Sequence, residues 1–297
     1  MIRTDYATLA TQIDDGLLWV RLNRPEQLNS FTVEMANELV DVFEAVNLDD
    51  SVRVVIVTGN GRAFCAGMDL SAEGNVFGLD ETMAPTMDDL NSRFDDPAVV
   101  AGVRDTGGRV TLAIYACTKP VIAAVNGAAV GIGATMTLAM DFRLASETAK
   151  IGFVFGRLGI VPEAASSWFL PRIVGLQQAL EWCYTADIFT ATEGKAGGLI
   201  RSVHAPDALL ADAEAFARRL VTNRSPVAVA LTRQMLMRNP ALDHPREAHR
   251  IDSLAMFYAS TGDGKEGVAA FREKRAPAFK GLASALPDFA RAWLKGA

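Results

Sequence analysis

The chain of 297 residues is half hydrophobic and 22% charged, and its net charge is −6 at pH 7. This composition is ordinary for a globular enzyme with a buried core, and the negative charge argues against a general nucleic-acid surface. Three cysteines at scattered positions favour neither a disulfide framework nor a metal site, so we expect no metal. We find no secretory signal and no membrane span, and we expect a cytoplasmic protein.

Strands and helices alternate at the start of the chain. Two strands flank a turn within residues 7–23, and an amphipathic helix capped by Ser30 or Thr32 is expected over 31–49. The β-branched run 52–59 predicts a strand buried on both faces, which ends in a loop that contains glycine.

The next segment, 71–104, lacks a clean periodicity and is acidic and rich in Gly, Met and Pro. We interpret it as a mobile or partly helical flap over a site, because long irregular segments are commonly functional. A helix over 109–118 and a strand over 121–125 are expected after it.

The stretch that follows this strand is the most informative in the chain. Small residues and the glycines at 131 and 133 lead from Asn126 into an apolar helix expected over 134–141. Glycines let the backbone approach a ligand and point N–H groups outward at a helix N-terminus. Residues 126–140 include no acid, His, Cys, Ser or Lys, so any proton transfer needs a side chain from another segment.

The second half of the chain becomes increasingly helical. After a further strand, Pro162 suits the first turn of a helix that runs onward from Glu163. Residues 199–297 have a helical pattern almost throughout, with a loop near 239–247. Strand–helix alternation followed by helices predicts an α/β core over 1–198 and then an α-helical C-terminal region.

Two strand–glycine-loop–helix units, 52–70 and 119–146, together resemble the crotonase (enoyl-CoA hydratase/isomerase) superfamily. The segments LNRPEQLNSF, LGIVPE and FREKRAPAFKG are also similar, so the resemblance covers nearly the whole chain. It implies an α/β fold in which a crotonase-like spiral of ββα units carries an α-helical C-terminal region. It also implies an acyl-CoA substrate with no other cofactor, fatty acid metabolism, and a homotrimer or dimer of trimers. Region 199–297 would then serve oligomerisation and supply part of the CoA site.

The resemblance further implies an oxyanion hole made of the backbone N–H groups of Met68 and Ile132. Deprotonation beside a thioester drives charge onto its oxygen, and preorganised donors at that oxygen are worth about 3–4 kcal/mol. A pair of tight turns that require glycine is the alternative interpretation of the two loops. A dinucleotide site is excluded, because Met136 stands where its fingerprint needs a third glycine.

The reaction is indicated by a departure from the family pattern. Family hydratases carry two glutamates that activate water, and these align with Thr135 and Phe155, which cannot take a proton. The run VPEAASSWFLP resembles Δ3,Δ2-enoyl-CoA isomerases of the PEG-x-SS type, whose catalytic glutamate matches Glu163. One base suffices there, because the proton taken from C2 returns to C4. Ala164 replaces the usual glycine, and stabilisation of a helix end is the alternative role of Glu163.

Further residues are candidates for binding the substrate or its CoA part. Cations and aromatic rings among them suit phosphates and adenine, and a plain surface position is the alternative interpretation of each cation and ring. The binding candidates are Arg24, Arg62, Ala66, Gly67, Gly131, Phe279 and Lys280. Asp69 and Asp141 match common family acids, and we expect both to anchor loops.

Three functions stay open on the sequence alone. The favoured one is isomerisation of an unsaturated acyl-CoA with Glu163 as the single base. The second is hydration, with water activated by Glu163 or by an acid of the 71–104 flap. The third is an acyl-CoA binding protein without turnover, which the missing acids at 135 and 155 would favour.

Overall fold

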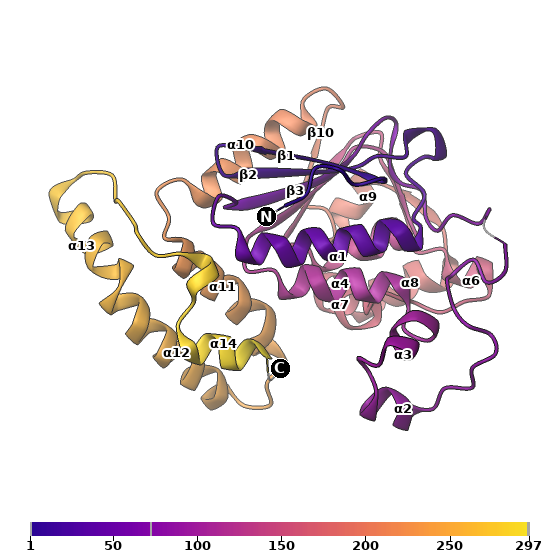
Figure 1. Ribbon diagram of the computed structural model, residues 1–297. Helices are drawn as coiled ribbons and strands as arrows, with labels where there is room; N and C mark the ends of the chain where they lie inside the picture. The colour runs from indigo at the N-terminus through magenta and orange to yellow at the C-terminus, as the bar shows by residue number, and fades with distance from the viewer. Residues whose placement is uncertain (1, 72, 296–297) are drawn as a thin grey trace.

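The computed structural model describes residues 2–71 and 73–295, and its strands form two sheets (Figure 1). The larger sheet has the order β1-β2-β3-β5-β7-β10, and the smaller has the order β4-β6-β8-β9. The strands of the larger sheet are β1 Leu9–Asp14, β2 Leu17–Leu22, β3 Val54–Gly59, β5 Val121–Val125, β7 Phe142–Ser146 and β10 Ser202–His204. Those of the smaller are β4 Ala63–Cys65, β6 Ala128–Val130, β8 Lys150–Gly152 and β9 Ile188–Thr190.

From β3 to β8, consecutive strands alternate between the two sheets. The pairs β3/β4, β5/β6 and β7/β8 each give their first strand to the larger sheet and their second to the smaller. The neighbours β3, β5 and β7 are parallel, and so are β4, β6 and β8. The chain therefore advances by one strand in both sheets with every turn of a spiral, which confirms the predicted fold class.

Helices cover both faces of the larger sheet. Helices α1 (Val33–Leu48) and α4 (Thr106–Ala116) pack on one face, and α10 (Leu209–Val221) packs on the other (Figure 1). Successive residues of β3 alternate between the two clusters, and all four of its valine and isoleucine side chains are buried. The prediction of a strand buried on both faces is thus confirmed.

The C-terminal helices form a separate small module beside this core (Figure 1). Helices α11 (Pro226–Arg238), α12 (Pro245–Thr261), α13 (Asp263–Glu273) and α14 (Asp288–Lys295) follow one another there. The module begins later than the expected residue 199. The reason is that β10 pairs with β7, and α10 lays the stripe Leu209, Ala213 and Ala217 on the larger sheet.

The other helices are short. They are α2 (Met87–Ser92), α3 (Pro97–Gly102), α5 (Ile132–Thr135), α6 (Phe155–Leu158), α7 (Ser166–Val174), α8 (Leu176–Thr185) and α9 (Ala191–Ala196), with 3-10 turns η1 (Pro25–Gln27), η2 (Met136–Ala139), η3 (Asn239–Ala241) and η4 (Ala283–Ala285). Within the described ranges, no helix combines the length and apolar character that crossing a bilayer requires.

One helix start differs from the sequence expectation. We expected a helix to run onward from Glu163, but α7 begins at Ser166. Ala164 and Ala165 have φ values of +57° and +51°, in the left-handed region, so the backbone reverses before the helix starts. Glu163 therefore lies in the loop before α7 and is not in its first turn.

Candidate active site

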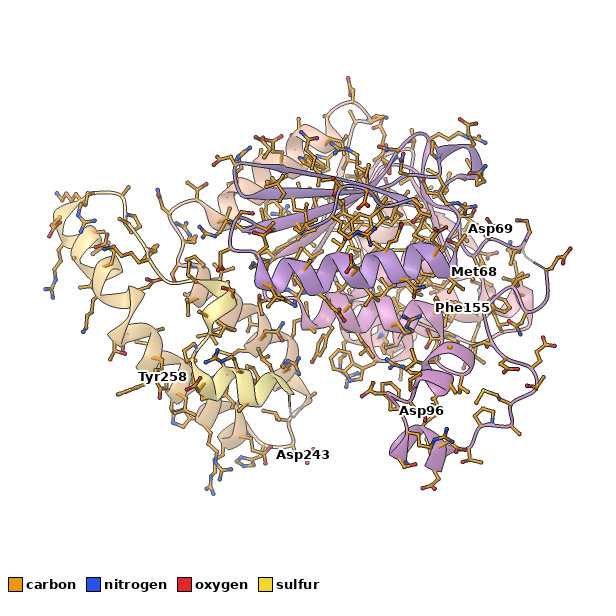
Figure 2. All side chains as sticks on the ribbon, in the orientation of Figure 1. Met68, Asp69, Asp96, Phe155, Asp243 and Tyr258 are labelled. Carbon is orange, nitrogen blue, oxygen red and sulfur yellow. The ribbon has the colours of Figure 1, made fainter. Side chains whose placement is uncertain are left out.

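A mainly apolar cavity of about 600 Å³ lies where three successive turns of the spiral end. Its walls are segments 66–68, after β4, 130–132, after β6, and 154–163, after β8. Phe77 and Leu79 of the 71–104 segment also line it. Figure 2 shows its residues Met68 and Phe155 together at one end of the molecule, far from the C-terminal module.

The strand register brings the two glycine loops side by side. β4 and β6 are parallel neighbours, with Ala63 opposite Ala128 and Cys65 opposite Ala129, so their carboxyl ends meet at one edge. The loops then pack closely. A Cβ on Gly133 would lie only 2.1 Å from the carbonyl oxygen of Cys65, so no larger residue fits there.

The predicted oxyanion donors, Met68 and Ile132, both line this cavity. The backbone around Met68 is fixed by Phe31, whose N–H donates to Gly67 O at 2.8 Å and whose carbonyl accepts from Asp69 N at 2.9 Å. Neither of these two hydrogen bonds uses the Met68 N–H. Ile132 is the first residue of α5, where a helical N–H has no acceptor within its helix.

Glycine is needed at the residue before each of these donors. Gly67 has a φ of +112° and Gly131 a φ of +54°, both in a region that other residues rarely adopt. The N–H of Gly131 also donates a hydrogen bond to Gly152 O of β8 at 2.9 Å, which links the second glycine loop to β8. The backbone at both loops is thus held in a fixed shape.

Glu163 faces the same cavity and is the predicted base. Thr135, which is fully buried, donates a hydrogen bond from Oγ1 to Glu163 Oε1 at 2.5 Å. Burial raises the pKa of Glu163 from its ordinary 4.5 to about 7, the Thr135 hydrogen bond opposes this rise, and the negative charge of Asp105 adds to it. A carboxyl of this kind can both take and return a proton near neutral pH.

Two residues that the sequence did not reveal complete the surroundings of Glu163. Asp105 caps α4 and accepts a hydrogen bond from the Ala164 N–H at 2.9 Å, and Gly107 stands beneath the Glu163 carboxylate. A Cβ on Gly107 would lie 2.2 Å from Glu163 Oε2. The signal in the sequence was the Gly107-Gly108 pair inside a helix, where glycine normally costs stability.

The two positions where family hydratases carry glutamates also lie at or near the cavity. Thr135 contacts Glu163 directly, and Phe155 is a buried part of the cavity wall. Two acids of the 71–104 flap, Asp80 and Glu81, are not among the residues that line the cavity. Asp80 instead caps its own turn by accepting from Thr82.

The candidates for CoA contact are distributed over three places. Ala66, Gly67 and Gly131 line the cavity. The guanidinium of Arg24 forms an ion pair with Asp69 at 2.8 Å and donates a hydrogen bond to the carbonyl oxygen of Ser30 at 2.6 Å. Arg62 is exposed in the turn before β4.

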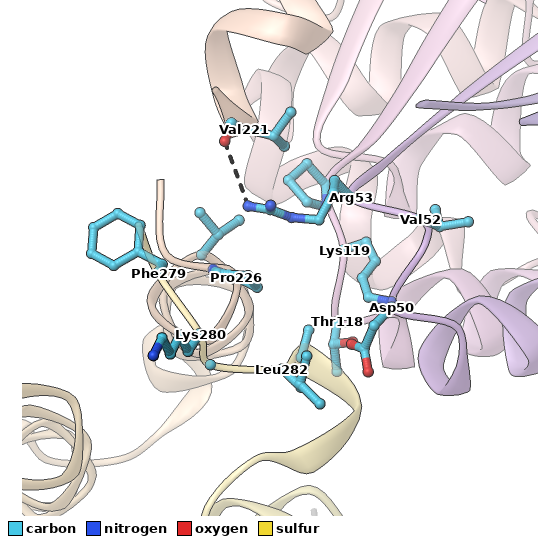
Figure 3. Close-up of a pocket in the computed structure, with 14 residues that line it drawn as sticks. Asp50, Val52, Arg53, Thr118, Lys119, Val221, Pro226, Phe279, Lys280 and Leu282 are labelled. Carbon is cyan, nitrogen blue, oxygen red and sulfur yellow. Dashed lines mark hydrogen bonds between the residues drawn. The ribbon is translucent and has the colours of Figure 1, made fainter. Parts of the chain in front are cut away.

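Phe279 and Lys280 line a second cavity of about 370 Å³, between the core and the C-terminal module (Figure 3). Asp50, Arg53 and Lys119 of the core form its other wall. One chain therefore does not bring the FKG segment to the cavity that holds Glu163.

The two remaining acids anchor loops. Asp69 accepts from the N–H and the hydroxyl of Ser71 as well as from Arg24, and these bonds hold its pKa below its ordinary range. Asp141 accepts from the Val121 N–H at 2.7 Å and pairs with buried Arg233. Across residues 2–71 and 73–295 we find no cluster of three metal-ligating side chains.

Comparison with known proteins gives a consistent result. Residues 12–282 match the model of the enoyl-CoA hydratase/isomerase family. An enoyl-CoA hydratase of Alternaria alternata is 41% identical over 269 residues, which cover 90% of this chain and 83% of that protein. A 1,2-epoxyphenylacetyl-CoA isomerase of Escherichia coli is 32% identical over 92% of this chain and 98% of its own length.

Solved structures agree with the sequence comparison. The crystal structure of an enoyl-CoA hydratase from Bacillus anthracis superposes with a TM-score of 0.78 at 30% identity, over 92% of this chain and 99% of the other. The family match, residues 12–282, includes both glycine loops and Glu163. The chain belongs to the enoyl-CoA hydratase/isomerase family, within the crotonase superfamily.

Proposed function

We propose that this protein shifts the double bond of an unsaturated acyl-CoA, with Glu163 as its single base. The observation that carries the proposal is that Glu163, with a pKa raised to about 7, lines the same apolar cavity as the two glycine loops. The apolar lining of this cavity suits the hydrocarbon part of an acyl chain.

The reaction is a balanced proton transfer. Glu163 takes a proton from C2 of a 3-enoyl thioester, and the electron pair of that C–H bond moves onto the thioester oxygen. The N–H groups of Met68 and Ile132 would donate to this oxygen and stabilise its charge. The protonated Glu163 then returns the proton to C4, and the product is the conjugated 2-enoyl thioester.

The residues at 135 and 155 support isomerisation over water addition. Thr135 has no basic group, and its hydroxyl already donates to Glu163. Phe155 has an apolar ring, which offers no acceptor for a water molecule in the cavity. Glu163 could therefore move a proton within the substrate without a second carboxylate.

Hydration is the second candidate, because two observations favour it. The relative from Alternaria alternata is called an enoyl-CoA hydratase. Asp105 also lines the cavity with Glu163, so two acids could hold a water molecule between them. This pair would replace the two family glutamates from different positions in the chain.

We also propose that the chain assembles through its C-terminal module into a homotrimer or a dimer of trimers. Large apolar side chains there are exposed, among them Phe271 at 85% and Leu236 at 72%. Exposed apolar side chains of this size commonly contribute to an interface. A neighbouring chain would then present its Phe279 and Lys280 to the CoA of another site.

The test offers 3-enoyl-CoA and 2-enoyl-CoA separately to the wild type and to Glu163→Gln. Formation of the conjugated thioester and of 3-hydroxyacyl-CoA is followed for each combination of substrate and protein. We expect isomerisation by the wild type and its loss in the variant. Water addition by the wild type at ordinary enzymatic rates would overturn the proposal in favour of hydration, and binding without turnover of either substrate would indicate an acyl-CoA binding protein.

A further inference from the structure

The Glu163 carboxylate is held by groups that would not themselves react. Thr135 donates to its Oε1 at 2.5 Å from the end of α5. Its Oε2 lies against Gly107 of α4, where a Cβ would come within 2.2 Å. The residue that follows it, Ala164, donates its N–H to Asp105 at 2.9 Å. Two separate elements of the core thus fix one side chain from both ends.

The hydroxyl of Thr135 has a specific reason to be where it is. The side chain is fully buried in a stretch of apolar residues, where a threonine hydroxyl without a partner would cost about 1–3 kcal/mol. Its hydrogen-bond partner is the carboxylate of Glu163. A valine would fill the same volume without that cost, so the hydroxyl is explained by the carboxylate.

Asp105 acts on the backbone next to the base. Its Oδ1 accepts from Gly108 N as the cap of α4 and also from Ala164 N. Ala164 has a φ of +57°, which is unfavourable for a residue with a Cβ. The hydrogen bond to Asp105 stabilises this backbone conformation and in this way would orient the Glu163 side chain.

We propose that Thr135 and Asp105 are the positioning residues of the base: Thr135 orients the Glu163 carboxylate through its hydroxyl, and Asp105 orients Glu163 through the adjacent backbone. The inference deepens the proposed function, since it takes Glu163 as the base. It is testable without turnover, because the two residues act on the ionisation of Glu163 in opposite directions.

The charged surroundings of Glu163 are simple. The ionisable groups that face it are Asp105, from the start of α4, and Cys65, from β4. Burial raises the pKa of the Cys65 thiol to about 12, so Cys65 carries no charge at neutral pH. The Thr135 hydrogen bond lowers the pKa of Glu163, and the charge of Asp105 raises it.

Three variants separate these effects. Thr135→Val keeps the shape of the side chain and removes the hydroxyl, and Thr135→Ser is its matched control because it keeps the hydroxyl. Asp105→Asn keeps an oxygen that can accept from the Ala164 N–H and removes the charge, so it tests the electrostatic effect of Asp105. A further variant, Asp105→Ala, removes that acceptor as well, and it should lower kcat about tenfold more than Asp105→Asn if the backbone bond orients Glu163. Protein carrying carbon-13 at its glutamate carboxyls is titrated by NMR, and Glu163→Gln identifies the Glu163 signal by its loss.

We expect the pKa of Glu163 to rise by about 0.5–1 in Thr135→Val, to fall by a similar amount in Asp105→Asn, and to change little in Thr135→Ser. Thr135→Val should also lower kcat about tenfold while KM changes less than about threefold. An unchanged pKa of Glu163 in both Thr135→Val and Asp105→Asn would overturn the inference.

The outcome separates this inference from the proposed function. If Glu163→Gln keeps the activity of the wild type while the two titration shifts are found, the proposed base is wrong and the positioning contacts stand. If Glu163→Gln loses activity and the shifts are absent, the base stands and the positioning roles fail. If Thr135→Val does not fold, Thr135→Ala, which also removes the hydroxyl, takes its place in the titration.

Discussion

The cavity that holds Glu163 and the C-terminal module are built in opposite ways. At the cavity, the Glu163 carboxylate and the adjacent Ala164 N–H have fixed partners, and the strand register brings the two glycine loops side by side. In the module, the buried core is small and large apolar side chains face outward. The comparison teaches that one chain holds the groups that would move the proton, whereas the exposed apolar surface of the module is where the proposed contact with a second chain would form.

The largest effect should come from filling the space beneath the base. In Gly107→Ala, the new methyl group would collide with Glu163 Oε2 and with Ile132 Cδ1, so we expect kcat for isomerisation to fall about 100-fold or more. The matched control is Gly156→Ala in α6, where a Cβ would meet nothing nearer than 3.7 Å. Equal steady-state kinetics for both variants would mean that the carboxylate is not confined as the cavity indicates.

The second prediction concerns the cost of burying Glu163. Between pH 4.5, its ordinary pKa, and about 7, its raised value, the folded state binds more protons than the unfolded state. Stability therefore falls as the pH rises through this window. Glu163→Gln removes the penalty, so the variant should unfold with a free energy about 1–3 kcal/mol higher than the wild type at pH 8.

Urea denaturation at pH 4 and at pH 8 measures this difference. The two proteins should be about equally stable at pH 4, where the carboxyl is protonated in both states. A wild type that is more stable than Glu163→Gln at pH 8 would contradict the buried, raised carboxyl.

The third prediction uses the module to sharpen the comparison. Phe271→Glu replaces the most exposed aromatic ring of the module with a negative charge and should prevent assembly. Light scattering would detect the resulting fall in molecular mass. If neighbouring chains supply part of the CoA site, KM for an acyl-CoA should rise about tenfold. The kcat for the corresponding pantetheine thioester should change less than about threefold.

The exposed strand residue Gln12 gives a control of equal charge change, Gln12→Glu, for the assembly measurement. Loss of kcat on the pantetheine thioester in Phe271→Glu would show instead that the cavity itself depends on assembly.

The sequence predicted those features of the site that depend on local backbone chemistry. The two glycine loops, the buried strand between residues 52 and 59 and the Thr32 cap all follow from patterns within a few residues. The helix start at Glu163 was wrong, because alanine gives no local signal for the left-handed conformation that Ala164 and Ala165 adopt.

Contacts between distant segments could not be predicted in this way. Asp105 lies 58 residues before Glu163 and reaches the adjacent Ala164 only because α4 packs beside α5 and the loop before α7. The place of Lys280 depends on how the module lies against the core. Tertiary packing decides both, and neither leaves a periodic pattern in the sequence.

The most direct measurement is the pH dependence of isomerisation of 3-enoyl-CoA by the wild type and by Glu163→Gln. The account predicts that kcat/KM of the wild type rises with pH and levels off above about pH 7, as the Glu163 carboxyl ionises. In Glu163→Gln, kcat/KM should be about 10²–10⁴-fold lower and this limb should be absent. A variant within a few-fold of the wild type, with the same pH profile, would contradict the claim that Glu163 is the base.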